Sequence, residues 1–153
     1  VNPIRFVYAN ILAGIVISYL QSVVLILYLS LFYNITIPSI VGVMFALLLG
    51  VIFSQLLASL LIMLVKKASL AQAIITVYII IAMMAGGFFV SFETSDLVVF
   101  LERFSSPLAW VRYLTYGFID NDFSVILLGG SLLVGAILIL LLLTYKFSQR
   151  VLQ

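Results

Sequence analysis

The sequence predicts an all-α polytopic membrane protein with four transmembrane helices and a re-entrant or interfacial helical segment before the last span. Of the 153 residues, 66% are hydrophobic and 8% are charged, with a mean hydropathy of +1.41. Soluble domains carry about 25% charged residues. The charges are also sorted: five basic residues flank long apolar runs, and all five acids lie within residues 91–122. Basic flanks at every second boundary are the positive-inside pattern of multi-span helical proteins.

Four apolar runs are each long enough for a helix to cross a hydrocarbon core of roughly 30 Å, which takes about 20 residues. They cover residues about 6–33, 39–65, 68–90 and 123–145, and we expect one transmembrane domain over residues 1–153. Four crossings put both termini on one side of the membrane. The flanking basic residues predict that this side is the cytoplasm and that the protein is a multi-pass protein of the cell membrane; they are Arg5, Lys66, Lys67, Lys146 and Arg150.

Residues 91–122 form a segment that is too polar to span a membrane and too apolar for an ordinary loop. Two basic and five acidic residues give it a net charge of −3, which places it outside the cell in this orientation. Apolar residues of its first half repeat as one face of a helix, namely Leu97, Phe100, Leu101 and Phe104. Ser106 and Pro107 are typical of the start of a second short helix, as its N-cap and first position. Two interpretations remain open: paired short helices that dip into the outer leaflet, or an extracellular loop with one surface helix.

Small residues recur every fourth position along the second span. They are Gly42, Ala46, Gly50, Ser54 and Ala58. Such spacing allows two helix backbones to approach closely within a membrane. We therefore expect this span to pack tightly against another helix, which is a structural feature rather than a functional one.

The third span carries a mildly polar stripe that includes Gln72, Thr76 and Met83. This face could line a cavity or a subunit interface. Alternatively, its hydroxyl and amide groups bond to neighbouring helices or to carbonyls of their own helix. In the outer segment, Trp110 and Tyr113 are the kind of rings expected at the headgroup boundary.

Several residue types are absent, and these absences narrow the function. No charged residue lies within the four apolar runs, whereas ion-coupled carriers usually need one. The chain has no histidine and no cysteine, and it has no glycine-rich phosphate-binding loop with lysine. We expect no catalytic, cofactor-binding or metal-binding residue in this chain, so the energy for any transport has to come from a partner.

The order of these elements resembles the C-terminal two-thirds of ABC-2 type permeases, the membrane subunits of ATP-binding-cassette exporters. The likeness covers nearly all of the chain and is best from Ser105 to Gly117, within the run "FSSPLAWVRYLTYGF". Ser106 stands where the family commonly has asparagine, while Pro107 and Leu108 match. The run "MMAGGFF", residues 83–89, is similar to the end of the family's penultimate helix.

The resemblance implies a six-span domain, of which this chain holds the last four spans as a fragment. It further implies a dimer with a second permease protomer, membrane lipid around it, and an ATP-binding-cassette ATPase subunit or domain that carries ATP and Mg²⁺. No nucleic-acid partner is expected. Gln72, Thr76 and Met83 become candidates for the substrate pathway, and Pro107, Trp110 and Tyr113 candidates for an outer gate or interface.

The function expected from this resemblance is ATP-driven export of a hydrophobic or amphipathic cargo through a cavity without charges. A drug, an antimicrobial peptide or a lipid would suit such a cavity. The alternative is a non-transporting four-span protein, such as an assembly partner, an immunity factor or a sensor that uses its outer segment as a binding surface.

Overall fold

The computed structural model describes residues 3–33, 39–85 and 106–151, and these residues form five α-helices. The helices are α1 (Pro3–Tyr33), α2 (Ile40–Val65), α3 (Ala68–Ala85), α5 (Pro107–Asp120) and α6 (Phe123–Val151). The predicted short helix around residues 97–104 and the end of the third predicted span, residues 86–90, lie outside the described residues. The second predicted short helix is confirmed as α5.

Three helices are long and apolar enough to cross a membrane: Arg5–Phe32, Ile40–Val65 and Phe123–Gln149. The described part of the third predicted span is a shorter apolar helix, Ala68–Met84. At 1.5 Å per residue, the 18 residues of α3 measure about 27 Å, close to the thickness of a hydrocarbon core. The chain is thus a helical protein of the kind that lies in membranes.

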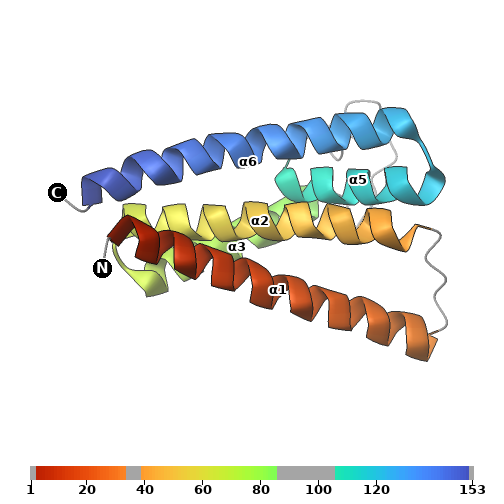
Figure 1. Ribbon diagram of the computed structural model, residues 1–153, viewed down its shortest axis with the longest axis horizontal. Helices are drawn as coiled ribbons and strands as arrows, with labels where there is room; N and C mark the ends of the chain where they lie inside the picture. Colours follow the sequence, from red (N-terminus) through yellow and green to blue (C-terminus); the bar gives the residue numbers. More distant parts are fainter. Residues whose placement is uncertain (1–2, 34–38, 86–105, 152–153) are drawn as a thin grey trace.

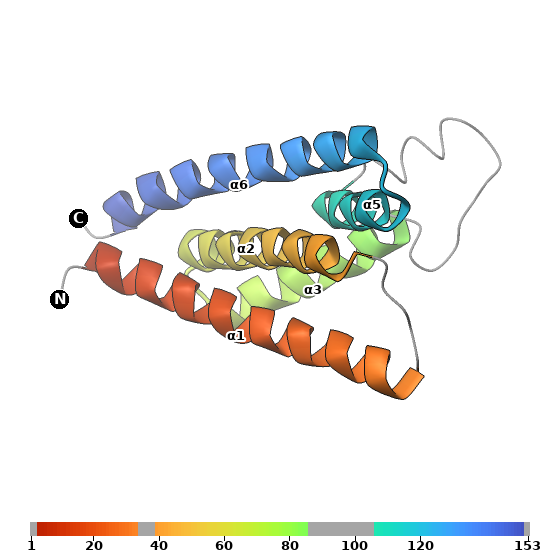
Figure 2. The same ribbon diagram turned by 45° about the vertical axis from the view of Figure 1, so that its right-hand side comes forward.

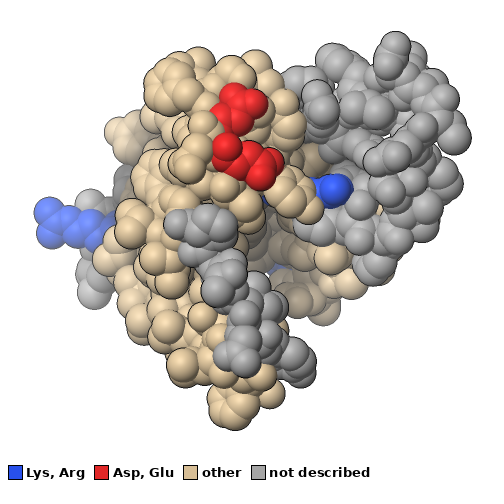
Figure 3. Space-filling model, turned by 90° about the vertical axis from the view of Figure 1, so that its right-hand side faces the viewer, with Lys and Arg blue, Asp and Glu red and all other residues tan. Residues whose placement is uncertain are grey.

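The long helices run alternately in opposite directions, so both termini lie at one end of the bundle (Figure 1). The α2–α3 turn, with Lys66 and Lys67, lies at this same end. The opposite end holds the α5–α6 turn. There, Asp120 and Asp122, the acids among the described residues, gather on the surface (Figure 3). The charge segregation expected from the sequence is therefore a property of the folded bundle.

Helix α2 lies at the centre of the bundle and contacts each of the other four helices (Figure 2). The buried core joins α2 to α1, α5 and α6; its members are Ile11, Ala46, Phe53, Leu56, Leu60, Leu114, Leu133, Ile137 and Leu140. The outward faces remain apolar: Leu12, Val24 and Leu142 are all more than half exposed. A surface of this composition suits lipid rather than water.

Two of the small residues of α2, Gly42 and Gly50, lie close against α5. A Cβ atom added at Gly42 would collide with the ring of Phe118. One added at Gly50 would come within 3.0 Å of Val111 Cγ2. Phe118 also meets Phe45 edge to face, with ring centroids 6.4 Å apart. The stripe is thus filled at these points by the short helix rather than by another span.

Helices α5 and α6 form a tight helical hairpin. Asn121 ends α5 in the left-handed conformation, with φ of 56°, and its N–H donates to Gly117 O; asparagine adopts this conformation more readily than most residues. Gly129 of α6 lies against the backbone of α5, because a Cβ there would be 3.2 Å from Leu114 N. The turn and this close contact fix α5 along the first half of α6 (Figure 1).

The contacts of α5 also fix its position along the axis of α2, here called its depth. Phe118, near its end, lies against Gly42 at the start of α2, and Val111 lies against Gly50. Gly50 follows Ile40 by ten residues, which is about 15 Å along the helix axis. Helix α5 therefore begins near the middle of α2 and runs out toward the acidic end of the bundle.

Candidate functional site

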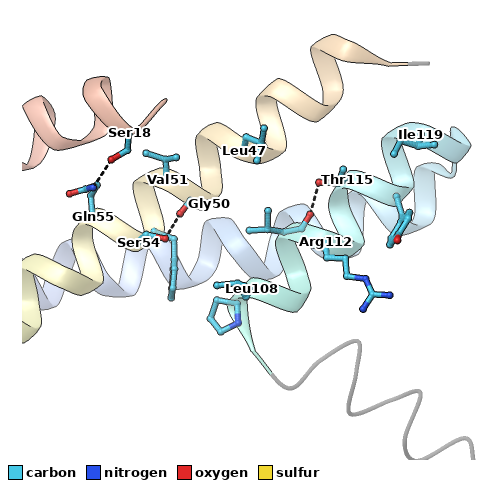
Figure 4. A pocket seen from close by; sticks show the side chains of 14 residues that line it. Ser18, Leu47, Gly50, Val51, Ser54, Gln55, Leu108, Arg112, Thr115 and Ile119 are labelled. Carbon is cyan, nitrogen blue, oxygen red and sulfur yellow. Dashed lines mark hydrogen bonds between the residues drawn. The ribbon is translucent and has the colours of Figure 1, made fainter. Parts of the chain in front are cut away.

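An open cavity of about 680 Å³ lies between α1, α2 and α5, at the level where α5 begins (Figure 4). Its volume is within the range of small-molecule sites. Most of its surface is apolar, and its polar groups come from a few side chains. The lining residues are Ser18 of α1; Leu47, Gly50, Val51, Phe53, Ser54 and Gln55 of α2; and Pro107, Leu108, Val111, Arg112, Thr115, Tyr116 and Ile119 of α5.

A hydrogen bond between α1 and α2 closes one side of the cavity. Gln55 Nε2 donates to Ser18 Oγ at 2.9 Å (Figure 4). The amide also lies flat against Gly14, where an added Cβ would be 2.5 Å from Gln55 Oε1. Glycine at position 14 thus gives the amide room to reach Ser18. Interhelical bonds of this kind contribute about 0.6 kcal/mol on average in a membrane protein, so the pair positions α1 more than it stabilises the whole fold.

The hydroxyl groups on the other walls bond within their own helices. Ser54 Oγ donates to Gly50 O at 2.8 Å, and Thr115 Oγ1 donates to Val111 O at 2.8 Å. Such bonds to the preceding turn satisfy a hydroxyl in an apolar environment. The hydroxyl oxygens can still accept a hydrogen bond, so the cavity presents weak acceptors at these two positions.

Arg112 is a charged residue of the cavity wall. Its side chain is partly buried, and its Cζ lies 5.5 Å from the centroid of the Tyr116 ring, one turn later on α5. Figure 4 shows the guanidinium directed away from the Ser18–Gln55 pair. Helix α5, which is not a span, thus brings an arginine alongside the middle of α2, and the uncharged cavity expected along the third span stays a prediction.

The start of α5 is held by its predicted cap. Ser106 Oγ accepts a hydrogen bond from Ala109 N at 3.2 Å and lies 3.5 Å from Ala82 O of α3. Pro107 occupies the first helical position, where its missing N–H costs nothing. Ser106 is only 4% exposed, so the cap both begins the helix and joins it to α3 inside the bundle.

The three outer-gate candidates fall in different surroundings. Pro107 lines the cavity. Trp110 packs against the buried core, and its Nε1 is buried without a hydrogen-bond acceptor among the described residues. Tyr113 is partly buried on α5 and makes a further interaction. Of the three, Pro107 is the one that the structure places at the cavity.

The substrate-pathway candidates of α3 do not line this cavity. Gln72 and Thr76 are exposed, and Met83 is partly buried. Thr76 Oγ1 donates to Gln72 O at 2.9 Å, as expected if its hydroxyl is satisfied within its own helix. Their exposed face is open to lipid or to a second protomer, and their role in a pathway stays a prediction.

From the sequence, we did not select Gln55, Arg112, Thr115 or Tyr116 as pathway residues. The signal for the last three was present, because positions i, i+3, i+4, i+7, i+8 and i+11 share one face of a helix; here they are Leu108, Val111, Arg112, Thr115, Tyr116 and Ile119. The spacing does not show how far along α2 that face lies, because this position depends on the packing between α5 and α2.

Among the residues that the structure describes, no three histidine, cysteine, aspartate or glutamate side chains converge as metal ligands would. Comparison with models of known protein families, with curated proteins and with solved structures gave no match.

Proposed function

We propose that this chain is a membrane-spanning permease subunit of an ATP-binding-cassette exporter of the ABC-2 type, and that α5 acts as its re-entrant element. In this proposal the termini and the Lys66–Lys67 turn face the cytoplasm of a cell-membrane protein. A partner ATPase binds there, and a second protomer completes the pathway. The cargo is hydrophobic or amphipathic.

The observation that carries the proposal is the depth of α5. Helix α5 begins beside the middle of α2 and leads through Asn121 into the last apolar helix. The non-helical backbone at Ser106, just before α5, therefore lies well below the acidic end of the bundle. Irregular backbone at membrane depth is tolerated where it is buried in protein or lines a cavity. Here Ser106 is buried, and Pro107 lines the cavity.

The packing of the hairpin supports a gating role for α5. Its contacts to α2 include the close approaches of Phe118 to Gly42 and of Val111 to Gly50, beside the ring contact of Phe118 with Phe45. Its contact to α1 is indirect, across the open cavity that the two helices line together. A movement of α1 relative to α5 would therefore change the width of the cavity while α2, α5 and α6 stay packed together. Rigid-body rocking of this kind is how many transporters alternate access.

The test is extraction of the full-length protein from its own membranes in mild detergent, followed by assays for a co-purifying soluble subunit and for vanadate-sensitive ATP hydrolysis. The proposal expects both. A four-span protein that purifies alone, without hydrolysis, would overturn it and favour an assembly, immunity or sensing role.

A further inference from the structure

A second groove, between α1, α2 and α6, lies in the half of the bundle that holds both termini. Its volume is about 390 Å³, which is large enough for a ligand. Ile11 and Leu56 form a buried floor, and Leu12 at the rim is 65% exposed. The other described lining residues are Tyr8, Ala9, Ile15, Ile52 and Leu141. The groove is thus mainly apolar, and it opens on the apolar outer surface of the bundle.

Arg5 continues the α1 wall of this groove toward the basic end of the bundle. It shares one face of α1, at positions i, i+3, i+4 and i+7, with Tyr8, Ala9 and Leu12. Arg5 is exposed and lies about 4.5 Å from Tyr8 along the helix axis, while Ile15 lies about 10 Å further in. On α6, Tyr145 follows Leu141 by one turn and is close enough to Tyr8 for the two phenol groups to interact.

From the end of the bundle inward, the groove presents a basic, then a phenolic, then an apolar surface. A phospholipid has a matching order of phosphate, glycerol esters and acyl chain. A guanidinium can bind two phosphate oxygens together, and tyrosine rings favour the headgroup boundary. Lys146, next to Tyr145, is also exposed and adds positive charge at this end. This charge favours an anionic phospholipid over a neutral one, and over a second apolar helix, which would match the apolar wall but not Arg5.

We infer that this groove binds an anionic phospholipid of the leaflet at the basic end, with the phosphate at Arg5 and an acyl chain between α1 and α6. The groove shares no described lining residue with the α1/α2/α5 cavity, so the lipid is a ligand separate from any cargo there. Its binding needs neither an ATPase nor transport. Failure to bind lipid and failure to recruit an ATPase are therefore separate results.

A single tryptophan at the rim of the groove can report which lipid occupies it. Trp110→Phe removes the only tryptophan of the chain, and it breaks no hydrogen bond to a described residue, since Trp110 Nε1 has no acceptor there. Leu12→Trp then places the reporter at the rim. The purified full-length variant is reconstituted in neutral lipid with phosphatidylglycerol or phosphatidylcholine, at equal mole fraction, whose acyl chains carry bromine. Bromine quenches tryptophan on contact, so the ratio of quenching gives the preference for the anionic lipid.

Leu142→Trp, in the same Trp110→Phe background, is the matched control. Leu142 is 70% exposed on α6 and does not line the groove. It precedes Val151 by nine residues, as Leu12 follows Pro3 by nine (151 − 142 and 12 − 3), so both reporters lie at a similar distance from the basic end. The control measures the general attraction of that end for anionic lipid. We expect the preference in the Leu12→Trp protein to exceed it about fivefold, as for one basic residue near an anionic surface.

Three further changes, each in the Leu12→Trp protein, separate the arginine from the groove. Arg5→Gln should lower the preference to the control value, while Arg5→Lys keeps the charge and should retain part of the preference, even if Arg5→Gln does not fold. Ala9→Phe fills the groove and leaves the charge, and it should also lower the preference. Lys67→Gln removes a charge of the α2–α3 turn at the same end and should leave the preference unchanged.

Four outcomes would overturn the inference of a lipid site in this groove. The first is an equal preference in the Leu12→Trp and Leu142→Trp proteins. The second is a full preference after Arg5→Gln or Ala9→Phe. The third is the same loss after Lys67→Gln as after Arg5→Gln, because the preference would then come from the basic end as a whole. The fourth is loss of the preference on addition of inorganic phosphate at constant ionic strength, because the site would then bind a soluble anion.

Discussion

Gly42 and Gly50 show how single residues decide whether α5 can lie against α2. Leucine at position 42 would clash with Phe118, and leucine at position 50 would clash with Val111. Overpacking of this kind costs about 1–3 kcal/mol. We therefore expect both variants to lower the free energy of unfolding by about that amount, measured by titration from mild detergent into sodium dodecyl sulfate.

Gly135 of α6 is the matched control for these variants. It is also a glycine within an apolar helix, but a Cβ there meets nothing within 4 Å. Gly135→Leu should change stability by less than about 1 kcal/mol, as expected from helix propensity alone. Equal effects at all three positions would show that the close contact between α2 and α5 does not depend on these glycines.

Helix α5 depends on Ser106 for its beginning. Ser106→Ala removes the acceptor for Ala109 N, and loss of such a cap costs about 1 kcal/mol. We expect faster hydrogen exchange at the first amides of α5, with Ser106→Thr restoring protection. Ser131→Ala, which removes a hydroxyl that bonds only to Leu128 O on exposed α6 surface, is the control. Unchanged exchange in Ser106→Ala would contradict a capping role.

Helix α6 depends on Asp122 in a pH-dependent manner. The pKa of its carboxyl is lowered from 3.8, chiefly by the hydrogen bond from the Ser124 hydroxyl and then by the Val125 and Ser124 N–H groups. A lowered folded-state pKa means that the contribution to stability is complete above the usual value and is lost as pH falls through the lowered one. Thermal unfolding should thus differ between the unmodified protein and Asp122→Asn at neutral pH, and this difference should shrink below about pH 3.8.

Asp120→Asn is the control for this pH dependence, since it removes the same charge two residues earlier and leaves the Asp122 cap intact. Its difference from the unmodified protein should not follow the same course with pH. A constant stability difference between the unmodified protein and Asp122→Asn across the acid range would refute the assignment of Asp122 as the titrating cap.

The whole molecule has a basic end and an acidic end, and this polarity predicts its orientation. Because the chain has no cysteine, single cysteines can be introduced as reporters without background. Asp120→Cys should react with a membrane-impermeant maleimide on intact cells, whereas Gln149→Cys should react only after permeabilisation. The opposite pattern would show that the acidic end faces the cytoplasm.

The elements of this fold were largely predictable because each depends on local sequence. The apolar runs predicted α1, α2 and α6 to within a few residues at most boundaries, and Ser106–Pro107 predicted the start of α5. At its end, α6 continues past Lys146 to Val151. Length and hydropathy indicate which part of a helix can cross a membrane, but they do not indicate where the helix ends. A lysine near the interface does not stop a helix, because its long side chain can reach toward the headgroups.

The sequence by itself determined the helical membrane class, the small-residue stripe of α2 and the separation of basic from acidic ends. These properties follow from composition, periodicity and order along the chain. Only the tertiary structure decided that the stripe packs against α5 and that Arg112 lies at a cavity between α1, α2 and α5. The physical reason is that sequence periodicity specifies which residues share a helix face. The depth and partner of that face are set by how side chains far apart in the chain fit together.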